Sequence, residues 1–336
     1  MKKLIKIGKR QIGEGYPALI IAEIGINHNG NIKLAKKLID VAKDAGADVA
    51  KFQSFKTDDL LSNKDVNYQK IKALELTDNM HYEIMDYCKS KDILFMSSVC
   101  DEPTVDFLEK QGVLAYKIAS CDLTNLPLVS YIAKKGKPII ISSGFGKLND
   151  IRDALEAIKR EGNEEIILLH CIAAYPPKVE EMNLRFMQRL AKEFNVLVGL
   201  SDHSMTIEIP QAAVTLGAVC IEKHITLSRE MEGFDHKASI EPQELKKMIE
   251  GIRIIEKALG NGERQIIGDE FKLSKIMKRS ILANKDIKKG EVLKKEMLSI
   301  KRPGEGLPAK ELPNLIGKLV LRDIKEGDYI KFEDLK

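Results

Sequence analysis

Short apolar runs and amphipathic stretches alternate along the chain from Leu19 onward. The apolar runs have the length of strands and are hydrophobic nearly throughout, which is typical of strands buried on both faces of a parallel sheet. They are predicted at 19–24, 49–54, 93–99, 115–120, 138–143, 165–171, 196–201 and 219–223. Helical patterns lie between and after them, at 32–45, 80–89, 104–111, 126–135, 149–159, 183–194, 207–216 and 242–259.

Eight strand–helix units in about 240 residues have the size of a TIM (β/α)8 barrel. The alternative is a doubly wound parallel sheet, which would open its first helix with Gly-x-Gly-x-x-Gly. The turn after the first predicted strand reads GINHNG at 25–30, and its glycines have the wrong spacing. The pattern therefore favours an α/β barrel, whose active site would be built from the C-terminal ends of the strands.

The alternation of strand and helix patterns ends after residue 260. Residues 261–279 are charged and irregular, which predicts a linker. Residues 280–336 carry short strand signals separated by turn sequences such as Lys-Lys-Gly-Glu. We therefore predict a barrel domain at 1–260, a linker at 261–279 and a small, mostly β domain at 280–336. So small a domain has a thin core and gains stability by docking on something larger.

Composition excludes several classes of partner. Of the 336 residues, 44% are hydrophobic and 31% are charged, as in a globular protein with an ample core. The 54 basic and 50 acidic residues leave a net charge of +4, a mixed surface without the basic footprint of a nucleic-acid-binding protein. No apolar run approaches the roughly 18 residues of a membrane span, and the N-terminus lacks a signal-peptide pattern. We expect neither a nucleic-acid nor a membrane partner.

The five cysteines support an intracellular setting. Their number is odd and no CxxC pair occurs. Buried, reduced thiols in a cytoplasmic protein are the expected arrangement.

Two histidines lie at the same level of neighbouring predicted strands. His203 and His224 follow or end two apolar runs that are joined by one short helical pattern. Parallel strands with such a crossover bring their C-terminal ends together, so the two imidazoles can converge. With Asp202, Glu222 and Lys223 around them, they indicate a metal site or an acid/base site. Packing or capping of a strand end is the less favoured alternative, because it would not place two histidines at one level.

A second group of polar residues at the strand ends suits an anion. It consists of two lysines and four serines: Lys51, Lys117, Ser98, Ser120, Ser142 and Ser201. Lysines supply point charge and serines supply hydroxyl donors, a combination that fits a phosphate or carboxylate. The alternative is structural pairing of the lysines with Glu23 and Asp122. Next to the histidines, the group predicts a metal-assisted reaction of a phosphorylated or carboxylated substrate. A Schiff base on Lys117 remains an alternative.

Several longer stretches match one known family in order along the chain. They read IAEIGINHNG at 21–30, KFQSFK at 51–56, YKIAS at 116–120, NLPL at 125–128, GLSDH at 199–203, EKH at 222–224 and DHKAS at 235–239. On these stretches the chain resembles the N-acetylneuraminate (sialic acid) synthase family. The C-terminal part resembles the antifreeze-like SAF domain of the same family. The resemblance implies a TIM barrel followed by an SAF domain.

The resemblance also implies a reaction. Phosphoenolpyruvate would condense with N-acetylmannosamine, or a related acylated hexose, to give an N-acetylneuraminate-type nonulosonic acid and phosphate. A divalent metal, usually Mn²⁺ with Mg²⁺ or Co²⁺ as alternatives, would be held by His203 and His224 and would bind the open-chain sugar aldehyde. The lysines and serines of the anion group match positions around phosphoenolpyruvate. Positions on the sugar side match Gln53, Tyr175 and Asp235, and Glu23 matches an acidic residue at the metal site.

Two positions, Arg302 and Asp122, bear on how the sugar is bound and converted. Arg302 matches the SAF-domain arginine that reaches across a domain-swapped homodimer to the acyl group of the sugar. Asp122 stands where the family often carries Glu, and its carboxylate is one methylene shorter. If that group moves a proton in the condensation, Asp122 must sit closer to the sugar or act through water. The expected catalytic set is therefore Glu23, Lys51, Lys117, Asp122, His203 and His224.

The sequence leaves three other functions to consider. A close variant would use a diacetamido-trideoxy hexose and make legionaminic or pseudaminic acid. A non-catalytic sugar-binding protein, inactive through Asp122, is disfavoured by the retained histidines, lysines and Arg302. A 3-deoxy-sugar-acid phosphate synthase is disfavoured by the SAF tail.

Overall fold

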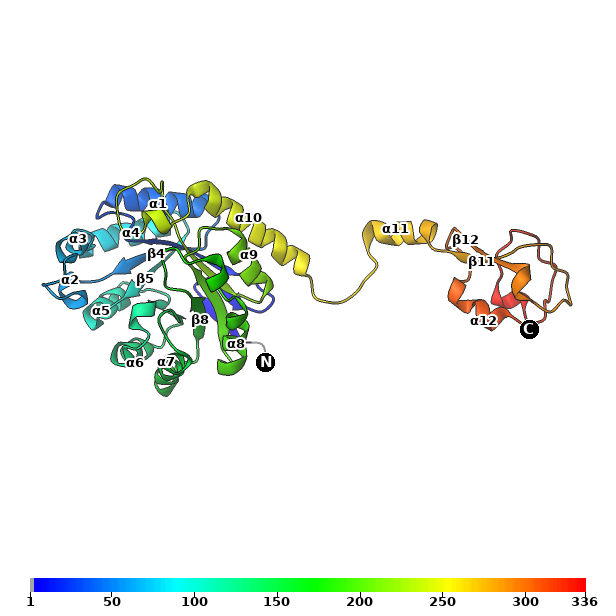
Figure 1. Cartoon of the computed structure of the whole chain (residues 1–336), viewed down its shortest axis with the longest axis horizontal. Coiled ribbons are helices and arrows are strands. Elements are labelled where there is room, and N and C mark those ends of the chain that lie inside the picture. The colour runs from blue at the N-terminus through cyan, green and yellow to red at the C-terminus, as the bar shows by residue number, and fades with distance from the viewer. Residues whose placement is uncertain (1–2) are drawn as a thin grey trace. The chain divides into compact units, whose positions relative to one another are not determined.

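The computed structural model describes residues 3–336 and divides the chain into two compact units, Met1–Gly260 and Asn261–Lys336 (Figure 1). The boundary falls where the alternation of strand and helix patterns ends in the sequence. No helix among the described residues is both long and apolar enough to cross a membrane.

The first unit is a TIM barrel, as predicted. Eight parallel strands close in the order β10-β3-β4-β5-β6-β7-β8-β9. They are β3 (Leu19–Gly25), β4 (Val49–Ser54), β5 (Leu94–Val99), β6 (Tyr116–Ile118), β7 (Ile139–Ser142), β8 (Ile166–Cys171), β9 (Leu197–Asp202) and β10 (Cys220–His224). Because the β3 and β10 strands pair in parallel, the sheet has no free edge within the barrel.

Helices surround the barrel. They are α1 (Ile32–Asp44), α4 (Asp78–Ser90), α5 (Glu102–Lys110), α6 (Leu126–Ala133), α7 (Leu148–Arg160), α8 (Arg185–Phe194), α9 (Glu208–Thr215) and α10 (Pro242–Leu259). Each predicted strand and helix of the barrel agrees with the observed one to within two residues at either end. Two short helices in the β4–α4 connection, α2 (Thr57–Leu60) and α3 (Tyr68–Lys72), were not predicted.

Side-chain alternation along the strands separates two apolar layers. In β3, Ile20, Ala22 and Ile24 face the helices, whereas Leu19 and Ile21 pack inside the barrel. The period of two then turns Glu23 inward, at the C-terminal end of the strand. The same parity explains how a strand that is apolar for most of its length can deliver one carboxylate to the barrel mouth.

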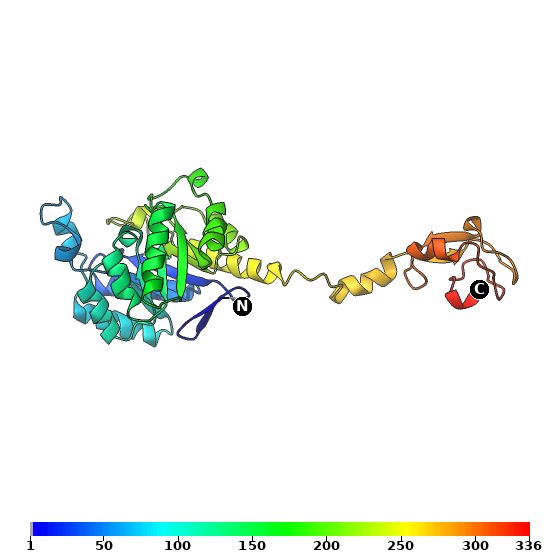
Figure 2. The same ribbon diagram turned by 90° about the horizontal axis from the view of Figure 1, so that it is seen from below.

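A hairpin that the sequence analysis did not predict covers the opposite end of the barrel. It consists of β1 (Leu4–Ile7) and β2 (Arg10–Gly13), seen in dark blue in Figure 2. Ile5, Ile7 and Ile12 are buried in the inner core together with residues of the barrel strands. The hairpin therefore seals the N-terminal end, while the C-terminal end stays open.

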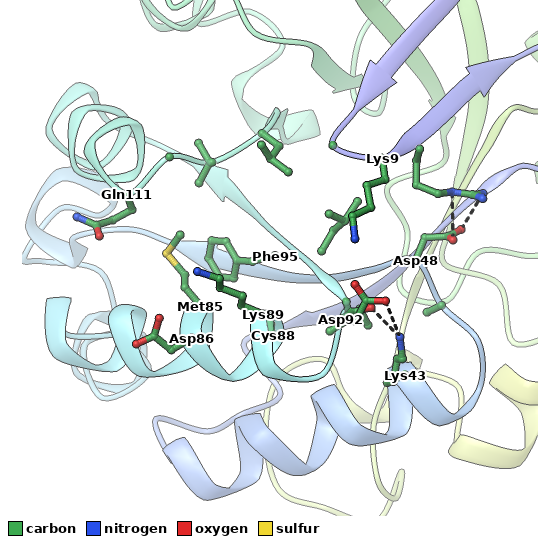
Figure 3. A pocket seen from close by; sticks show the side chains of 18 of the residues that line it. Lys9, Lys43, Asp48, Met85, Asp86, Cys88, Lys89, Asp92, Phe95 and Gln111 are labelled. Atoms are coloured by element: carbon green, nitrogen blue, oxygen red, sulfur yellow. Dashed lines mark hydrogen bonds and ion pairs between the residues drawn. The ribbon is translucent and has the colours of Figure 1, made fainter.

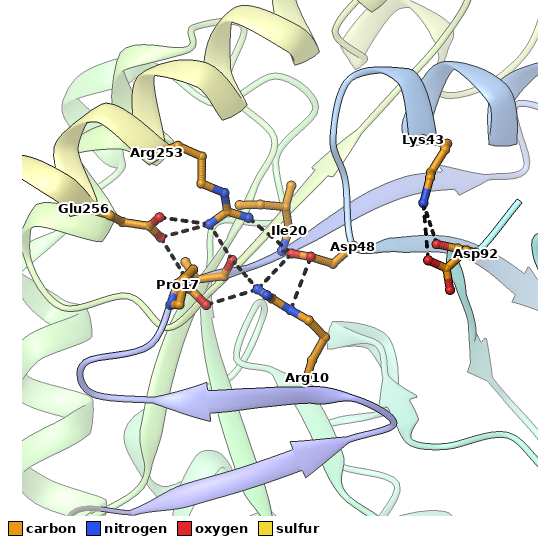
Figure 4. Close-up of polar contacts among 9 residues, drawn as sticks. Arg10, Pro17, Ile20, Lys43, Asp48, Asp92, Arg253 and Glu256 are labelled. Carbon is orange, nitrogen blue, oxygen red and sulfur yellow. Dashed lines mark hydrogen bonds and ion pairs between the residues drawn. The ribbon is translucent and has the colours of Figure 1, made fainter.

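A polar network fastens this hairpin to the barrel (Figure 4). The Asp48 carboxylate accepts a hydrogen bond of 2.9 Å from the Ile20 amide and lies 3.3 Å from both Arg10 Nε and Arg253 Nη2. Arg253 also pairs with Glu256 at 3.0 Å. One carboxylate thus links the hairpin, β3 and α10.

The second unit is small and mostly irregular around a few strands. It contains α11 (Gly268–Met277), β11 (Ser280–Ala283), β12 (Leu298–Lys301) and α12 (Leu312–Leu315). Antiparallel bridges such as Ile287 with Ile324 add to the β11–β12 pair, and a separate apolar cluster fills its centre. The segment expected to be irregular, 261–279, instead contains α11. None of the residues of this helix is buried in the unit, which explains why its pattern carried no clear amphipathic signal.

Candidate active site

A hollow of about 390 Å³ opens at the C-terminal ends of the barrel strands. Of the residues predicted for the site, twelve line it: Glu23, Lys51, Gln53, Ser98, Lys117, Ser120, Ser142, Tyr175, Ser201, His203, His224 and Asp235. They come from all eight strands or from the loops that follow them. This is the end of the barrel where such enzymes carry their active sites.

The two histidines converge as expected. His224 is the last residue of β10 and His203 directly follows β9, and their ring centroids are 5.3 Å apart. Nδ1 of His203 lies 2.9 Å from the Ile172 carbonyl oxygen, which orients the ring and leaves Nε2 free. The Tyr175 ring packs against that of His203, with centroids 4.1 Å apart and the two planes tilted by 38°. Both imidazoles are buried yet face the hollow.

His224 has a nitrogen with no hydrogen-bond partner. Its buried Nδ1 lies 3.8 Å from Asp235 Oδ2, beyond hydrogen-bond distance. Burial, with the neighbouring His203 as the next cause, holds the pKa of His224 well below its usual range. The imidazole is therefore neutral near pH 7, which is the form that binds a metal.

These residues fit a metal ion with few protein ligands. Within 3–336, no group of three or more His, Cys, Asp or Glu side chains is placed to hold a metal. Both imidazoles line the hollow, and the contact between His203 Nδ1 and the Ile172 carbonyl oxygen is of the kind that orients a metal-binding histidine through its other ring nitrogen. The donor set suits a divalent ion that completes its coordination with substrate or water.

The two lysines lie between two buried carboxylates. Lys51 Nζ is 2.7 Å from Glu23 Oε2 and 3.4 Å from Glu222 Oε2, and Lys117 Nζ is 3.8 Å from Glu222 Oε1. The alternative partner considered for the lysines, Asp122, forms no ion pair with either. Glu222 takes that place, because in β10 it faces the barrel interior like His224 two residues later.

Serines complete this group. Lys51 donates to Ser98 at 3.0 Å and Lys117 donates to Ser142 at 2.7 Å. Ser201 donates to Glu222 at 2.8 Å. The hydroxyls thus hold both ammonium groups and one carboxylate in place at the strand ends.

The two carboxylates have opposite pKa shifts. Burial raises the pKa of Glu23 to about 7, although Lys51 opposes the rise. Glu222 is equally buried, but Lys117 and Lys51 outweigh the burial and lower its pKa to about 2. Near neutral pH, Glu222 is ionised while Glu23 can exchange a proton. Such a divergence within one cleft is typical of an acid/base site.

A second ion pair lies behind the histidines. Lys223 Nζ is 2.5 Å from Asp202 Oδ2 and also donates to the Ser204 carbonyl oxygen. Both side chains are at most 1% exposed. Because Asp202 precedes His203 and Lys223 precedes His224, the pair fixes the two strand ends that carry the histidines.

Two predicted site residues do not line the hollow. Asp122 ends a 3₁₀ turn, Ser120–Asp122, where its carboxylate accepts hydrogen bonds from the Cys121 thiol and the Asn125 amide. Burial raises the pKa of Asp122. Arg302 belongs to the second unit, where it is exposed in the loop after β12.

Other residues line the hollow that sequence reasoning did not assign to it. Glu222 was predicted only as a neighbour of the histidines. Because it lies two residues before His224 on the same strand, the sequence could have placed its side chain on the same, inward face. Three of the five cysteines, Cys100, Cys121 and Cys171, also line the hollow. All five thiols are free, but only three are buried, since Cys100 is half-buried and Cys121 is exposed. Apolar side chains at the mouth, with no signal of their own, are Ile26, Phe55, Leu60, Ile71, Phe145 and Phe234.

A closed parallel barrel with this mouth, followed by a small β domain, defines a class of two-domain barrel enzymes. Comparison with known proteins narrows the class. Residues 38–264 match the model of the NeuB family and residues 278–336 match that of the SAF domain. The chain belongs to the NeuB family and is an enzyme of the nonulosonic acid synthase type, as the sequence motifs predicted.

Individual relatives extend over nearly the whole chain. An uncharacterised protein from Methanocaldococcus jannaschii is 44% identical over 98% of both chains. The N,N'-diacetyllegionaminic acid synthase of Campylobacter jejuni is 43% identical, over 93% of this chain and 98% of its own length. Among solved structures, the N-acetylneuraminic acid synthetase of Leptospira borgpetersenii, in complex with citrate, is 35% identical with a TM-score of 0.77, over 81% of this chain and 95% of its own.

Proposed function

We propose that the chain condenses phosphoenolpyruvate with an acylated amino hexose to give a nonulosonic acid and phosphate. The observation that carries the proposal is the juxtaposition, in one hollow, of two serine-held lysines with two convergent imidazoles. The lysines suit the anion, and the imidazoles mark the position of the sugar carbonyl. Membership of the NeuB family supports a reaction of this class.

The charges of the hollow support an anionic substrate. Lys51 carries a full charge, because Glu222 and Glu23 outweigh the burial and raise its pKa. Glu222 cancels one positive charge, and Glu23 can become neutral by taking up a proton. Protonation of Glu23 would free Lys51 for the phosphate or carboxylate of phosphoenolpyruvate, with serine hydroxyls donating alongside.

Glu23 is the group best suited to move a proton. Its pKa of about 7 lies where a general acid or base is most effective. It lies in register with Lys51 on the neighbouring strand and beside His224, so it reaches both halves of the hollow. In this proposal Glu222 remains ionised and offsets the repulsion between the two ammonium groups that it contacts.

The metal is part of the proposal. His203 and His224 would hold a divalent ion, Mn²⁺ as the first candidate and Mg²⁺ or Co²⁺ as alternatives. When bound, such an ion would polarise a carbonyl oxygen as a Lewis acid. The protein supplies the orientation: the Ile172 carbonyl fixes His203, and the Lys223–Asp202 pair fixes both strand ends.

N-acetylmannosamine is the sugar that the sequence motifs favour, with Gln53, Tyr175 and Asp235 on the sugar side. A second candidate, a diacetamido-trideoxy hexose, has support from the mouth of the hollow. Phe55, Phe145 and Phe234 line it, and they suit the methyl groups of a deoxy sugar with two acetamido substituents better than a row of hydroxyls. The 43% identity to a diacetyllegionaminic acid synthase points the same way.

The second unit has a role in the proposal through Arg302. Its guanidinium is a five-donor fork that suits an amide carbonyl of the sugar. We propose a homodimer in which each Arg302 serves the barrel of the other copy, so that the small domain also gains buried surface.

Phosphate release tests the proposed function. The metal-stripped full chain is mixed with phosphoenolpyruvate and N-acetylmannosamine, or 2,4-diacetamido-2,4,6-trideoxy hexoses of the manno and altro series, with and without Mn²⁺. We expect release only with metal and sugar together, fastest with the physiological sugar. No release with any of these sugars in the presence of metal refutes the proposal. Equal release with and without metal refutes the metal assignment alone.

A further inference from the structure

A second, larger hollow of about 840 Å³ lies away from the active site (Figure 3). The N-terminal hairpin, α1, α4 and the starts of the strands at the sealed end of the barrel enclose it. No residue among 3–336 lines both hollows. The volume lies within the range of sites for small ligands.

The floor of this second hollow is apolar and partly exposed. Leu94 and Phe95 begin β5, and Phe95 stacks on Phe52 with ring centroids 5.8 Å apart. Leu114 is 45% exposed, and Tyr82 on α4 is exposed to the same degree. An apolar group that is exposed inside a hollow is a feature of ligand-binding grooves.

The hairpin turn contributes one wall. Gly8, with a φ of +58°, brings the turn so close that an added Cβ would lie 3.0 Å from Leu114 and 3.4 Å from Leu94. The next residue, Lys9, extends into the hollow from this turn (Figure 3). The hairpin thus places a cation directly beside the apolar floor.

Some of the charged side chains around the second hollow are paired and others are not. Arg10 Nε lies 3.3 Å from Asp48 and Lys43 Nζ lies 3.9 Å from Asp92, so each of these two cations has an acidic partner. The ammonium groups of Lys9 and Lys89 have no hydrogen-bond or ion-pair partner among the described residues. One acidic side chain in the lining, Asp86, is also unpaired, which leaves the free charge positive.

We propose that this second hollow binds a small amphipathic anion, a molecule with an apolar body that ends in a carboxylate or a phosphate. The body would cover Phe95, Leu94 and Leu114, and the anionic end would lie between Lys9 and Lys89. Charge complementarity and the exposed apolar floor together select this class. The proposal does not depend on the proposed function, because the two sites share no residue.

The absence of tryptophan from the sequence allows a clean test in the full chain. Tyr82→Trp places the sole tryptophan on the wall of the second hollow, where the Tyr82 ring already contacts Phe107. Anilinonaphthalene sulfonate is the probe, since it has an aromatic body and one anionic group. We expect it to quench Trp emission saturably at one equivalent. Octanoate or octyl phosphate should displace it, whichever terminal group the hollow prefers, and octanol should compete at least tenfold more weakly.

Matched charge variants localise the binding. In the Tyr82→Trp background, Lys9→Glu with Lys89→Glu should weaken the probe about tenfold or more. The control, Lys159→Glu with Lys192→Glu, reverses two exposed lysines outside the hollow and should change nothing. Thermal melting verifies the fold, and Lys9→Gln with Lys89→Gln provides a milder pair.

Four results would overturn the inference. They are absence of saturable quenching, equal probe affinity in the Lys9/Lys89 and control variants, displacement by octanol as effective as by the anions, and Trp emission that changes with protein concentration alone. The last would show that a second copy of the chain fills the hollow.

Discussion

Glu23 and Glu222 are chemically alike and equally buried, yet their protons behave differently. Glu222 lies near two ammonium groups and accepts a hydrogen bond from Ser201, which lowers its pKa to about 2. Glu23 has Lys51 as its cationic neighbour and also feels the charge of Glu222, so burial dominates and raises its pKa to about 7. The difference of one cation decides which carboxylate can exchange a proton near neutral pH.

Glu23→Gln tests this difference through stability. The folded protein binds a proton at Glu23 more tightly than the unfolded chain, in which the pKa of this carboxyl is near 4.5. Wild-type stability at this group is therefore greatest at low pH and falls as pH rises from about 4.5 to about 7, by up to about 1.4 kcal/mol per pH unit. Gln lacks this loss. We expect the free energy of unfolding of the variant, relative to wild type, to rise over that window, measured by urea unfolding of metal-free protein. A pH-independent difference would contradict the shifted pKa.

His203→Ala tests the metal assignment independently of the sugar. Mn²⁺ should raise the melting temperature of wild type, because a ligand that binds only the folded state stabilises it. The shift should vanish in His203→Ala, and turnover should fall at least 100-fold. His170→Asn is the control, since His170 is buried on β8 against the Met182 carbonyl oxygen and does not line the active-site hollow. An unchanged metal shift in His203→Ala would exclude His203 as a ligand.

At the scale of elements, the strand pattern predicts the barrel because each buried strand gives a near-continuous apolar run. It also predicts which side chains reach the mouth. The position of a residue in its strand decides which face the side chain is on and how close it lies to the C-terminal end. It did not predict that Lys117 would pair with Glu222, since an ion pair across the barrel depends on where side chains meet in space. The hairpin was missed because its four-residue strands are too short for a periodic signal.

The hairpin should matter for stability and not for catalysis. Ile12 is fully buried in the inner core, at the sealed end of the barrel. Ile12→Ala should lower the free energy of unfolding by about 2–5 kcal/mol through the cavity it leaves. The kcat for phosphate release should stay within about twofold of wild type, because the residue lies at the N-terminal end of the barrel, away from the end that carries the active site. A large fall in kcat at a temperature where the variant is folded would contradict this division.

The Lys223–Asp202 pair connects β9 and β10 behind the histidines. Lys223→Met leaves Asp202 buried without its partner and should cost about 3–5 kcal/mol in urea unfolding. Lys223→Met with Asp202→Leu removes both charges and should cost clearly less than the sum of the single changes. Additive losses would mean that the two side chains act separately. The double variant should still lose activity if the pair orients the histidines.

At the scale of the whole molecule, each unit has an apolar core of its own, so they can be tested apart. Residues 1–260 close the barrel without help from the second unit. A chain that ends at Gly260 should therefore fold and melt cooperatively. The activity of this truncated chain depends on the role of Arg302, which kinetic measurements can determine.

Arg302→Ala separates binding of the sugar from binding of phosphoenolpyruvate. If Arg302 serves the acyl group of the sugar, its loss should raise the KM for the sugar about tenfold and leave the KM for phosphoenolpyruvate within about twofold, because the lysines and serines that face the anion are untouched. Arg279→Ala removes an exposed arginine from the same unit and should change neither constant. An equal rise in both constants would argue against a sugar contact, and full activity of a chain truncated at Lys278 would exclude any role of the SAF domain in the site.

A mixture of His203→Ala and Arg302→Ala chains tests the exchange between copies. If Arg302 acts on the other copy, mixed dimers regain one barrel that has both an intact histidine pair and a donated arginine. If Arg302 acts on its own barrel, they regain none.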